Sequence, residues 1–122
     1  MTDVHQALYR FWSSFGVPAY LSGHVPDGAS VPYITFEVGD GEPFSSTFLV
    51  AIVWAADNAT RAALLDKIAE AIGADGTTIA LDGGGMLALY RNAGGFMSYY
   101  DDPEDKTILG GRVSYQVNFY HL

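Results

Sequence analysis

Four acidic side chains form the densest group in the sequence that could bind a ligand or take part in catalysis. Asp101, Asp102, Glu104 and Asp105 surround Pro103, and carboxylate oxygens are the ligands that Ca²⁺ prefers. Their spacing, however, lacks the alternating ligand positions and the distal bidentate Glu of a calcium-binding loop. The pattern therefore favours a solvated acidic loop over a calcium site.

Histidine, cysteine and glycine provide no stronger candidate for a metal, nucleophile or phosphate site. His5, His24 and His121 stand far apart, and none has a second His or a Glu three or four residues away. The chain has no cysteine, which excludes a thiolate zinc site, a disulfide and a cysteine nucleophile. Residues 83–85 are three glycines, but no Lys-Ser/Thr pair and no predicted helix follow, which favours a turn over a phosphate-binding loop. The sequence therefore predicts a protein that is not an enzyme and holds no metal or cofactor.

The charge of the chain argues against binding to nucleic acid. The formal net charge is −8, and the six Lys and Arg residues are scattered along the 122 positions. Stable binding to phosphate needs clustered positive charge, so we expect this chain to repel DNA.

The composition indicates one small domain with part of its surface covered by other proteins. Hydrophobic residues make up 49% of the chain and charged residues 16%, whereas about 25% charged is usual. Such a surface exposes more apolar area than most monomers do. The longest apolar run, residues 48–56, is far shorter than the ~20 residues that span a bilayer, and the first residues lack the pattern of a secretory signal. We therefore expect no membrane contact and folding in a cytoplasm.

Helical spacing marks two segments. The first has the apolar stripe Val4, Ala7, Leu8, Phe11, Trp12 and Phe15. Thr2 or Asp3 can cap its start, and Gly16 and Pro18 end it. The second starts at a cap formed by Asp57-Asn58 and closes at Gly73. Its predicted apolar stripe is Leu65, Ile68, Ala69 and Ile72, and its predicted outward side chains are Arg61, Asp66, Lys67 and Glu70.

Between these helices the pattern predicts two strands. Residues 33–38 alternate between apolar and polar, and residues 39–46 form a loop rich in glycine. Residues 47–56 are almost continuously apolar, which favours a central strand buried on both faces, although a buried helix fits the same run. We expect Trp12, Trp54 and Phe11 to pack in the core.

The second half of the chain predicts further strands and defines the fold class. Strands are expected at 77–81, 86–90 and 96–100, with turns at 82–85 and 92–95. In the last strand, residues 110–120, the apolar side chains Val113, Tyr115, Val117 and Phe119 alternate with polar ones. One face of that strand is then buried, and the other faces water or another protein. The whole chain, residues 1–122, is predicted to be a single α+β domain, a mostly antiparallel sheet with two helices packed on one face.

Several segments resemble one family of small phage proteins. They are residues 11–20 (FWSSFGVPAY), the turn 25–28 (VPDG), the strand 32–38 (PYITFEV) and the terminal strand 112–120. In this pattern the chain is similar to the tail terminator, or tail completion, proteins of long-tailed phages and prophages, which include minor capsid-like proteins.

The resemblance implies an α+β protomer that forms a ring, six-fold in that family. The ring caps the finished tail tube and meets the head connector, so the implied partners are other copies of the chain, the major tail tube protein and a head connector protein. The implied locations are the host cytoplasm during assembly and then the neck of the virion. The family has no catalytic residues to carry over. The alternatives are another head–tail part, such as a stopper or adaptor, and a small ligand-binding or enzymatic α+β domain.

Two loops are the expected sites of contact, because long loops in a small domain are often functional. The candidate subunit interface consists of Asp40, Gly41, Glu42, Pro43 and Phe44. The candidate lining of a DNA channel consists of the acids Asp101, Asp102, Glu104 and Asp105.

Overall fold

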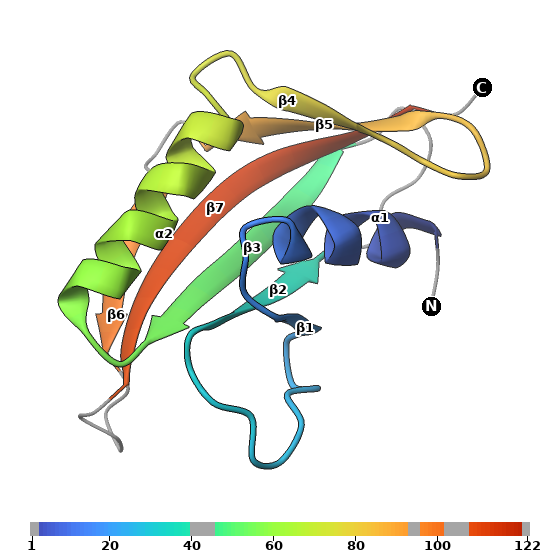
Figure 1. Ribbon diagram of the computed structural model, residues 1–122. Helices are drawn as coiled ribbons and strands as arrows, with labels where there is room; N and C mark the ends of the chain where they lie inside the picture. Colours follow the sequence, from blue (N-terminus) through green and yellow to red (C-terminus); the bar gives the residue numbers. More distant parts are fainter. Residues whose placement is uncertain (1–2, 40–45, 93–95, 102–107, 121–122) are drawn as a thin grey trace.

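The computed structural model describes residues 3–39, 46–92, 96–101 and 108–120 (Figure 1). The elements in chain order are α1 (Asp3–Ser13), β1 (Ala19–Leu21), β2 (Tyr33–Val38), β3 (Ser46–Ala55), α2 (Asn58–Ala71), β4 (Thr77–Ala80), β5 (Met86–Arg91), β6 (Met97–Asp101) and β7 (Leu109–Tyr120). The predicted class is confirmed, since the chain is an α+β domain built on one curled, mostly antiparallel sheet with two helices.

The strands lie in the order β1-β2-β3-β7-β5-β4, and β6 also pairs with β7. The long strand β7 therefore has three neighbours: β3 along one edge, and β5 and β6 along successive parts of the other. β1 pairs with β2 in parallel and was not predicted, because its three residues lie in a stretch rich in glycine and proline.

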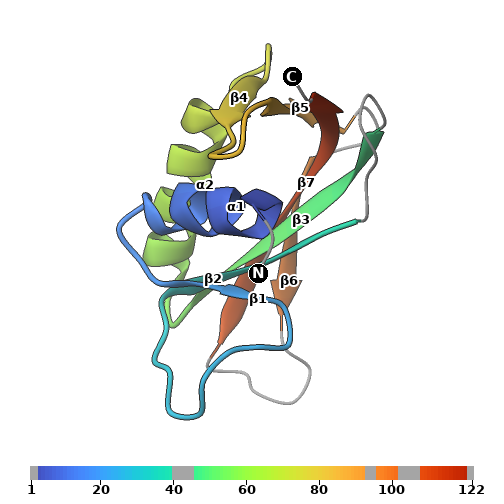
Figure 2. The ribbon, with the colours of Figure 1, turned by 90° about the vertical axis from the view of Figure 1, so that its right-hand side faces the viewer.

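Both helices lie on the same side of the sheet, which we call the inner face (Figure 2). α2 crosses the central strands β3 and β7, whereas α1 contacts β1 and β4. Because β1 and β4 are at opposite ends of the strand order, the sheet must curl around α1 for both to reach it.

The predicted stripe of α1 is confirmed as its core side. Leu8 and Trp12 are fully buried, and Trp12 lies 5.1 Å from Phe11 and 5.8 Å from Phe15, measured between ring centroids. Gly16 follows the helix with a φ of 89°, a left-handed conformation that favours glycine and ends a helix well. The predicted capping side chains of Thr2 and Asp3 lie outside the described part of the chain.

α2 begins at its predicted cap, where Asp57 Oδ1 accepts a hydrogen bond of 2.7 Å from the Thr60 N–H. This bond and the one from the Thr60 hydroxyl lower the pKa of the Asp57 carboxyl. Leu65, Ile68 and Ile72 are buried as predicted.

The prediction that Arg61 faces outward is wrong. Its guanidinium donates to the Gly110 carbonyl at 3.2 Å and to Asn58 Oδ1 at 2.8 Å, and it stacks 4.4 Å from the centre of the Tyr99 ring. These contacts hold the cation against the sheet, and only about a tenth of the residue is exposed.

β3 is central in the sheet, as predicted, but the prediction that both of its faces are buried is wrong. Leu49, Ala51 and Val53 are fully buried under the helices, whereas the alternate side chains point to the opposite, outer face and are only partly covered. Trp54 belongs to this outer row, where its Nε1 donates to Thr35 Oγ1 at 3.0 Å, so its predicted place in the core is also wrong. The reason is that no described element covers the outer face, while two helices cover the inner one.

Candidate functional site

The outer face carries a cluster of exposed, uncharged side chains where β3 begins and β7 ends. Four large hydrophobic residues there have exposed fractions between 36% and 49%: Phe48, Met86, Tyr90 and Tyr120. Gln116 on β7 stands between Phe48 of β3 and Tyr90 of β5, and Tyr120 pairs with Met86. We call these four residues, with Gln116 and Asn118, the outer patch.

The chemistry of the outer patch is that of a protein interface. Aromatic residues and methionine are enriched at interface cores, and charged residues are depleted there. The Gln116 side-chain amide donates to Asn118 Oδ1 at 3.1 Å, which orients both amides on the surface. Gly39 lies against the Phe48 ring so closely that a Cβ at this position would collide with it. Close packing against Gly39 therefore fixes the position of the Phe48 ring in the patch.

The sequence does not predict this patch, because the continuous apolar run of residues 47–56 indicates a strand buried on both faces. The terminal strand nevertheless contains a pattern that indicates where the patch lies. The terminal strand was predicted to have one open face, and the strands that pair with it must share that face. Phe48 and Tyr90 are cross-strand partners of Gln116, which that prediction placed on the polar side.

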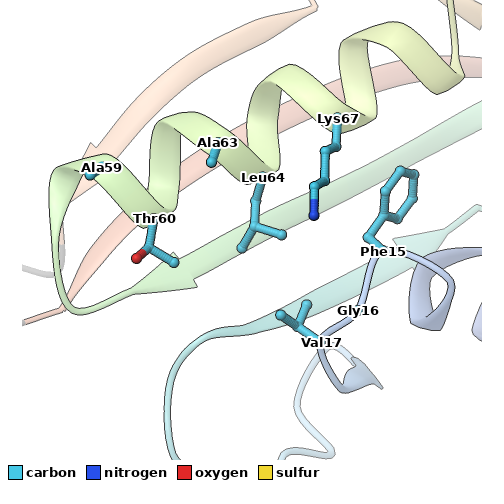
Figure 3. A pocket seen from close by; sticks show the side chains of 8 residues that line it. All are labelled: Phe15, Gly16, Val17, Ala59, Thr60, Ala63, Leu64 and Lys67. Carbon is cyan, nitrogen blue, oxygen red and sulfur yellow. The ribbon is translucent and has the colours of Figure 1, made fainter.

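A groove on the other side of the molecule runs between α2 and the segment that follows α1 (Figure 3). Its volume is about 390 Å³, and its lining is Phe15, Gly16, Val17, Ala59, Thr60, Ala63, Leu64 and Lys67. In Figure 3 the Lys67 side chain extends from α2 into the space between Leu64 and Phe15. The lining of the groove is thus mostly apolar, with one hydroxyl (Thr60) and one cation (Lys67).

A second hollow, of about 420 Å³, lies between α1 and β4. Arg10 and Asp82 form an ion pair of 3.1 Å on its rim, and both side chains are more than half exposed. Exposed pairs of this kind contribute little to stability, since water and salt screen them.

Two polar side chains, partly buried Arg91 and buried Tyr115, have structural roles. Arg91 donates from its guanidinium to the carbonyl of Ala69 at 2.9 Å and to that of Ile72 at 3.4 Å, and it stacks 4.1 Å from the centre of the Phe96 ring. A cation is favourable at this negative end of the helix dipole. Burial raises the pKa of Tyr115 to about 12, although the nearby Arg91 acts in the opposite direction.

Most of the predicted contact residues fall outside the described part of the chain. This applies to Asp40, Gly41, Glu42, Pro43, Phe44, Asp102, Glu104 and Asp105. Asp101 was predicted to open a loop, but its backbone instead ends β6 and pairs with Leu109, while its side chain is not described.

The structure describes several of the segments that were considered for phosphate binding, metal binding or membrane spanning. Residues 82–85 form the predicted turn, closed by a hydrogen bond of 3.1 Å from the Leu81 N–H to the Gly85 carbonyl, and β5 follows it. Among the described residues no group of three His, Cys, Asp or Glu side chains could hold a metal ion. Neither described helix is long and apolar enough to cross a bilayer.

Comparison of the sequence with models of known protein families and with curated proteins finds no match.

Proposed function

We propose that this chain is a structural subunit of a long-tailed phage or prophage, which caps the tail tube as a homo-oligomeric ring and joins it to the head connector. The observation that carries the proposal is the outer patch. An uncharged surface rich in aromatic side chains, on a chain with a net charge of −8, is suited to contact with protein. The resemblance of the sequence to tail terminators implies that the assembly is a ring and that its symmetry is six-fold.

The layout of the surface supports a ring. A closed ring of identical subunits uses two different patches on each copy, one meeting the other on the next subunit. The outer patch and the groove along α2 are two such surfaces, because they lie on opposite faces of the sheet. Each contact can be small, since the tail tube holds many subunits together at once.

The net charge of −8 suits a ring through which DNA passes. In this proposal Asp101, Asp102, Glu104 and Asp105 line the channel, where their charge is repeated in every subunit and repels phosphate. Replacing these four acids with lysine is expected to create salt-sensitive binding to duplex DNA, whereas the wild type should bind none even at low salt. Tight binding of DNA by the wild type at low salt would contradict this part of the proposal.

Electron microscopy of negatively stained tail tubes tests the central proposal. Tubes assembled from the tail tube protein of the same genome should acquire ring-shaped density at one end when this protein is added. The double variant Phe48→Ser/Tyr90→Ser should reduce the fraction of capped tubes, while the control Tyr9→Ser, which alters an exposed residue of α1, should not. Tubes that stay uncapped by folded wild-type protein would overturn the proposal, and binding to the head connector alone would favour a stopper or adaptor.

A further inference from the structure

The groove between α2 and the end of α1 has room for a large apolar side chain from outside. Phe15, Val17 and Leu64 provide apolar walls (Figure 3). The small side chains of Ala59 and Ala63 leave the space between these walls open. The volume of about 390 Å³ lies in the range of sites that bind compact groups.

Lys67 gives this groove a preference for negative charge. Its side chain is exposed, and it takes part in no ion pair within the described residues. Lys67 follows Leu64 by three residues and Ala63 by four, so all three are neighbours on one side of α2, with Cβ atoms roughly 5–6 Å apart. The surface that complements the groove is therefore a large apolar side chain with a carboxylate close beside it.

The outer face of the sheet presents this combination at Phe48 and Glu37. Among the outward side chains of the described strands, the charged ones are Glu37 and Arg112, so Glu37 is the acid of this set. Glu37 pairs with Val50, which places it diagonally next to Phe48 on the same face, roughly 7–8 Å away. Both side chains are exposed, and Glu37 takes part in no ion pair within the described residues.

We propose that Phe48 of one copy enters the groove of the next copy and that Glu37 then lies opposite Lys67. The inference deepens the proposed ring and rests on it, since it names the side chains through which neighbouring subunits meet. An aromatic side chain that fills a pocket supplies most of the energy of such a contact. A pair of opposite charges at its edge fixes the orientation of the two subunits.

The two surfaces of this contact cannot meet within one copy. Phe48 and Glu37 lie on the outer face, whereas α2 and the segment after α1 form the groove on the inner side, so the sheet stands between them (Figure 2). A contact between two different surfaces leaves one groove and one Phe48 free in each pair of copies. Further copies can fill these sites, and such a head-to-tail series closes into a ring when the rotation between neighbours permits it.

Chemical cross-linking tests the pairing without tail tubes, since the chain has no cysteine of its own. One variant carries Glu37→Cys and a second, of different tagged mass, carries Lys67→Cys, so that a dimer of mixed mass joins two copies. Arg10→Cys is the matched control for Lys67→Cys, because Arg10 is also an exposed cation but lies on α1 outside the groove lining. With a short bismaleimide, we expect at least about tenfold more mixed dimer with Lys67→Cys than with Arg10→Cys, a preference of about 1.4 kcal/mol. Equal yields would overturn the proposal.

The same assay tests the aromatic side chain. Adding Phe48→Ser to the Glu37→Cys variant should remove the excess of mixed dimer, because the groove then loses the ring that fills it. Adding Tyr9→Ser, at an exposed aromatic residue of α1, is the control and should leave the excess unchanged. An excess that survives Phe48→Ser would also contradict the pairing.

A charge exchange provides a measurement on the assembled particle. Glu37→Lys and Lys67→Glu should each lower the fraction of capped tubes, because each change places two like charges opposite each other. The double variant should recover the capped fraction, since the exchanged pair restores the attraction. Glu37→Lys combined with Arg10→Glu has the same net charge as this double variant and is the control. Equal recovery by the control would show that net charge controls capping, and it would overturn the pairing.

The outcomes separate this inference from the proposed function. Tubes capped by the wild type without selective cross-linking or charge rescue would overturn the groove pairing and leave the tail-terminator role intact. Selective cross-linking without capped tubes would support the pairing and overturn the role.

Discussion

The two faces of β3 are nearly equal in hydrophobicity but very different in environment. Leu49 is fully buried on the inner face, whereas its neighbour Phe48 is 49% exposed on the outer face. Both faces of such a strand could serve as a core, and the helices occupy only one of them. The hydrophobicity of a strand therefore indicates how much of its surface can be buried. Which helix, strand or neighbouring subunit covers that surface depends on the fold and on the assembly.

The largest expected effect lies in the core between α1 and the inner face. Trp12→Ala should lower the free energy of unfolding by about 3–5 kcal/mol, because it removes a fully buried ring and leaves a cavity. Chemical denaturation followed by far-UV circular dichroism measures the change. Tyr9→Ala, at an exposed position of the same helix, is the control. If both variants had the wild-type midpoint, α1 would be peripheral to the fold.

Substitution of adjacent residues of β3 compares the two faces directly. Leu49→Ala should cost about 2–5 kcal/mol of unfolding free energy, whereas Phe48→Ala should cost about 1 kcal/mol or less because half of its surface is already in water. We expect Phe48→Ala to impair tube capping while Leu49→Ala impairs folding. Equal losses of stability would show that the outer face is covered in the isolated protein.

Close packing of α2 on β7 predicts a smaller effect on the inner face. A Cβ at Gly111 would approach Leu65 Cδ1 to 2.6 Å, so Gly111→Ala should destabilise the protein by about 1–3 kcal/mol through overpacking. Gly73→Ala is the control, since no atom would lie within 4 Å of its Cβ. Thermal unfolding of the two variants measures the difference, and a Gly111→Ala variant as stable as Gly73→Ala would contradict the close approach of helix and strand.

The smallest effect at neutral pH is expected at Tyr115, whose hydroxyl is buried and has no hydrogen-bond partner among the described residues. Tyr115→Phe should change the stability by less than about 1 kcal/mol at pH 7, because it removes a polar group that gains nothing from burial.

The same substitution should matter more at alkaline pH. Burial raises the pKa of Tyr115 to about 12 in the folded protein, above the value of about 10 in an unfolded chain. The stability held by the neutral phenol is therefore complete below pH 10 and is lost as the pH rises toward 12. Unfolding midpoints measured across this pH range should fall less steeply for Tyr115→Phe than for the wild type. Parallel curves for the two proteins would contradict the raised pKa of Tyr115.

Local patterns in the sequence were sufficient to predict most of the framework. The stripe of α1, the Asp57 cap and the alternation along β7 each depend on residues close together in the chain, so their signals were readable without tertiary information. The predictions failed at Arg61, at Trp54 and along β3, where long-range neighbours determine the environment. The guanidinium of Arg61 contacts partners that are distant in sequence, the Gly110 carbonyl on β7 and the Tyr99 ring on β6, as well as Asn58 on its own helix.

By itself, the sequence determined the fold class, the acidic charge and the alternating faces of the terminal strand, since these follow from composition and from the spacing of apolar residues. Only the tertiary structure decided which face of the sheet the helices cover, and hence where the outer patch lies. It also brought the end of α1 beside α2, although more than forty residues separate Phe15 from Ala59, and so created the groove around Lys67. The physical reason is that the curl of the sheet and the placement of the helices depend on contacts between distant segments, which the spacing of residues along the chain does not encode.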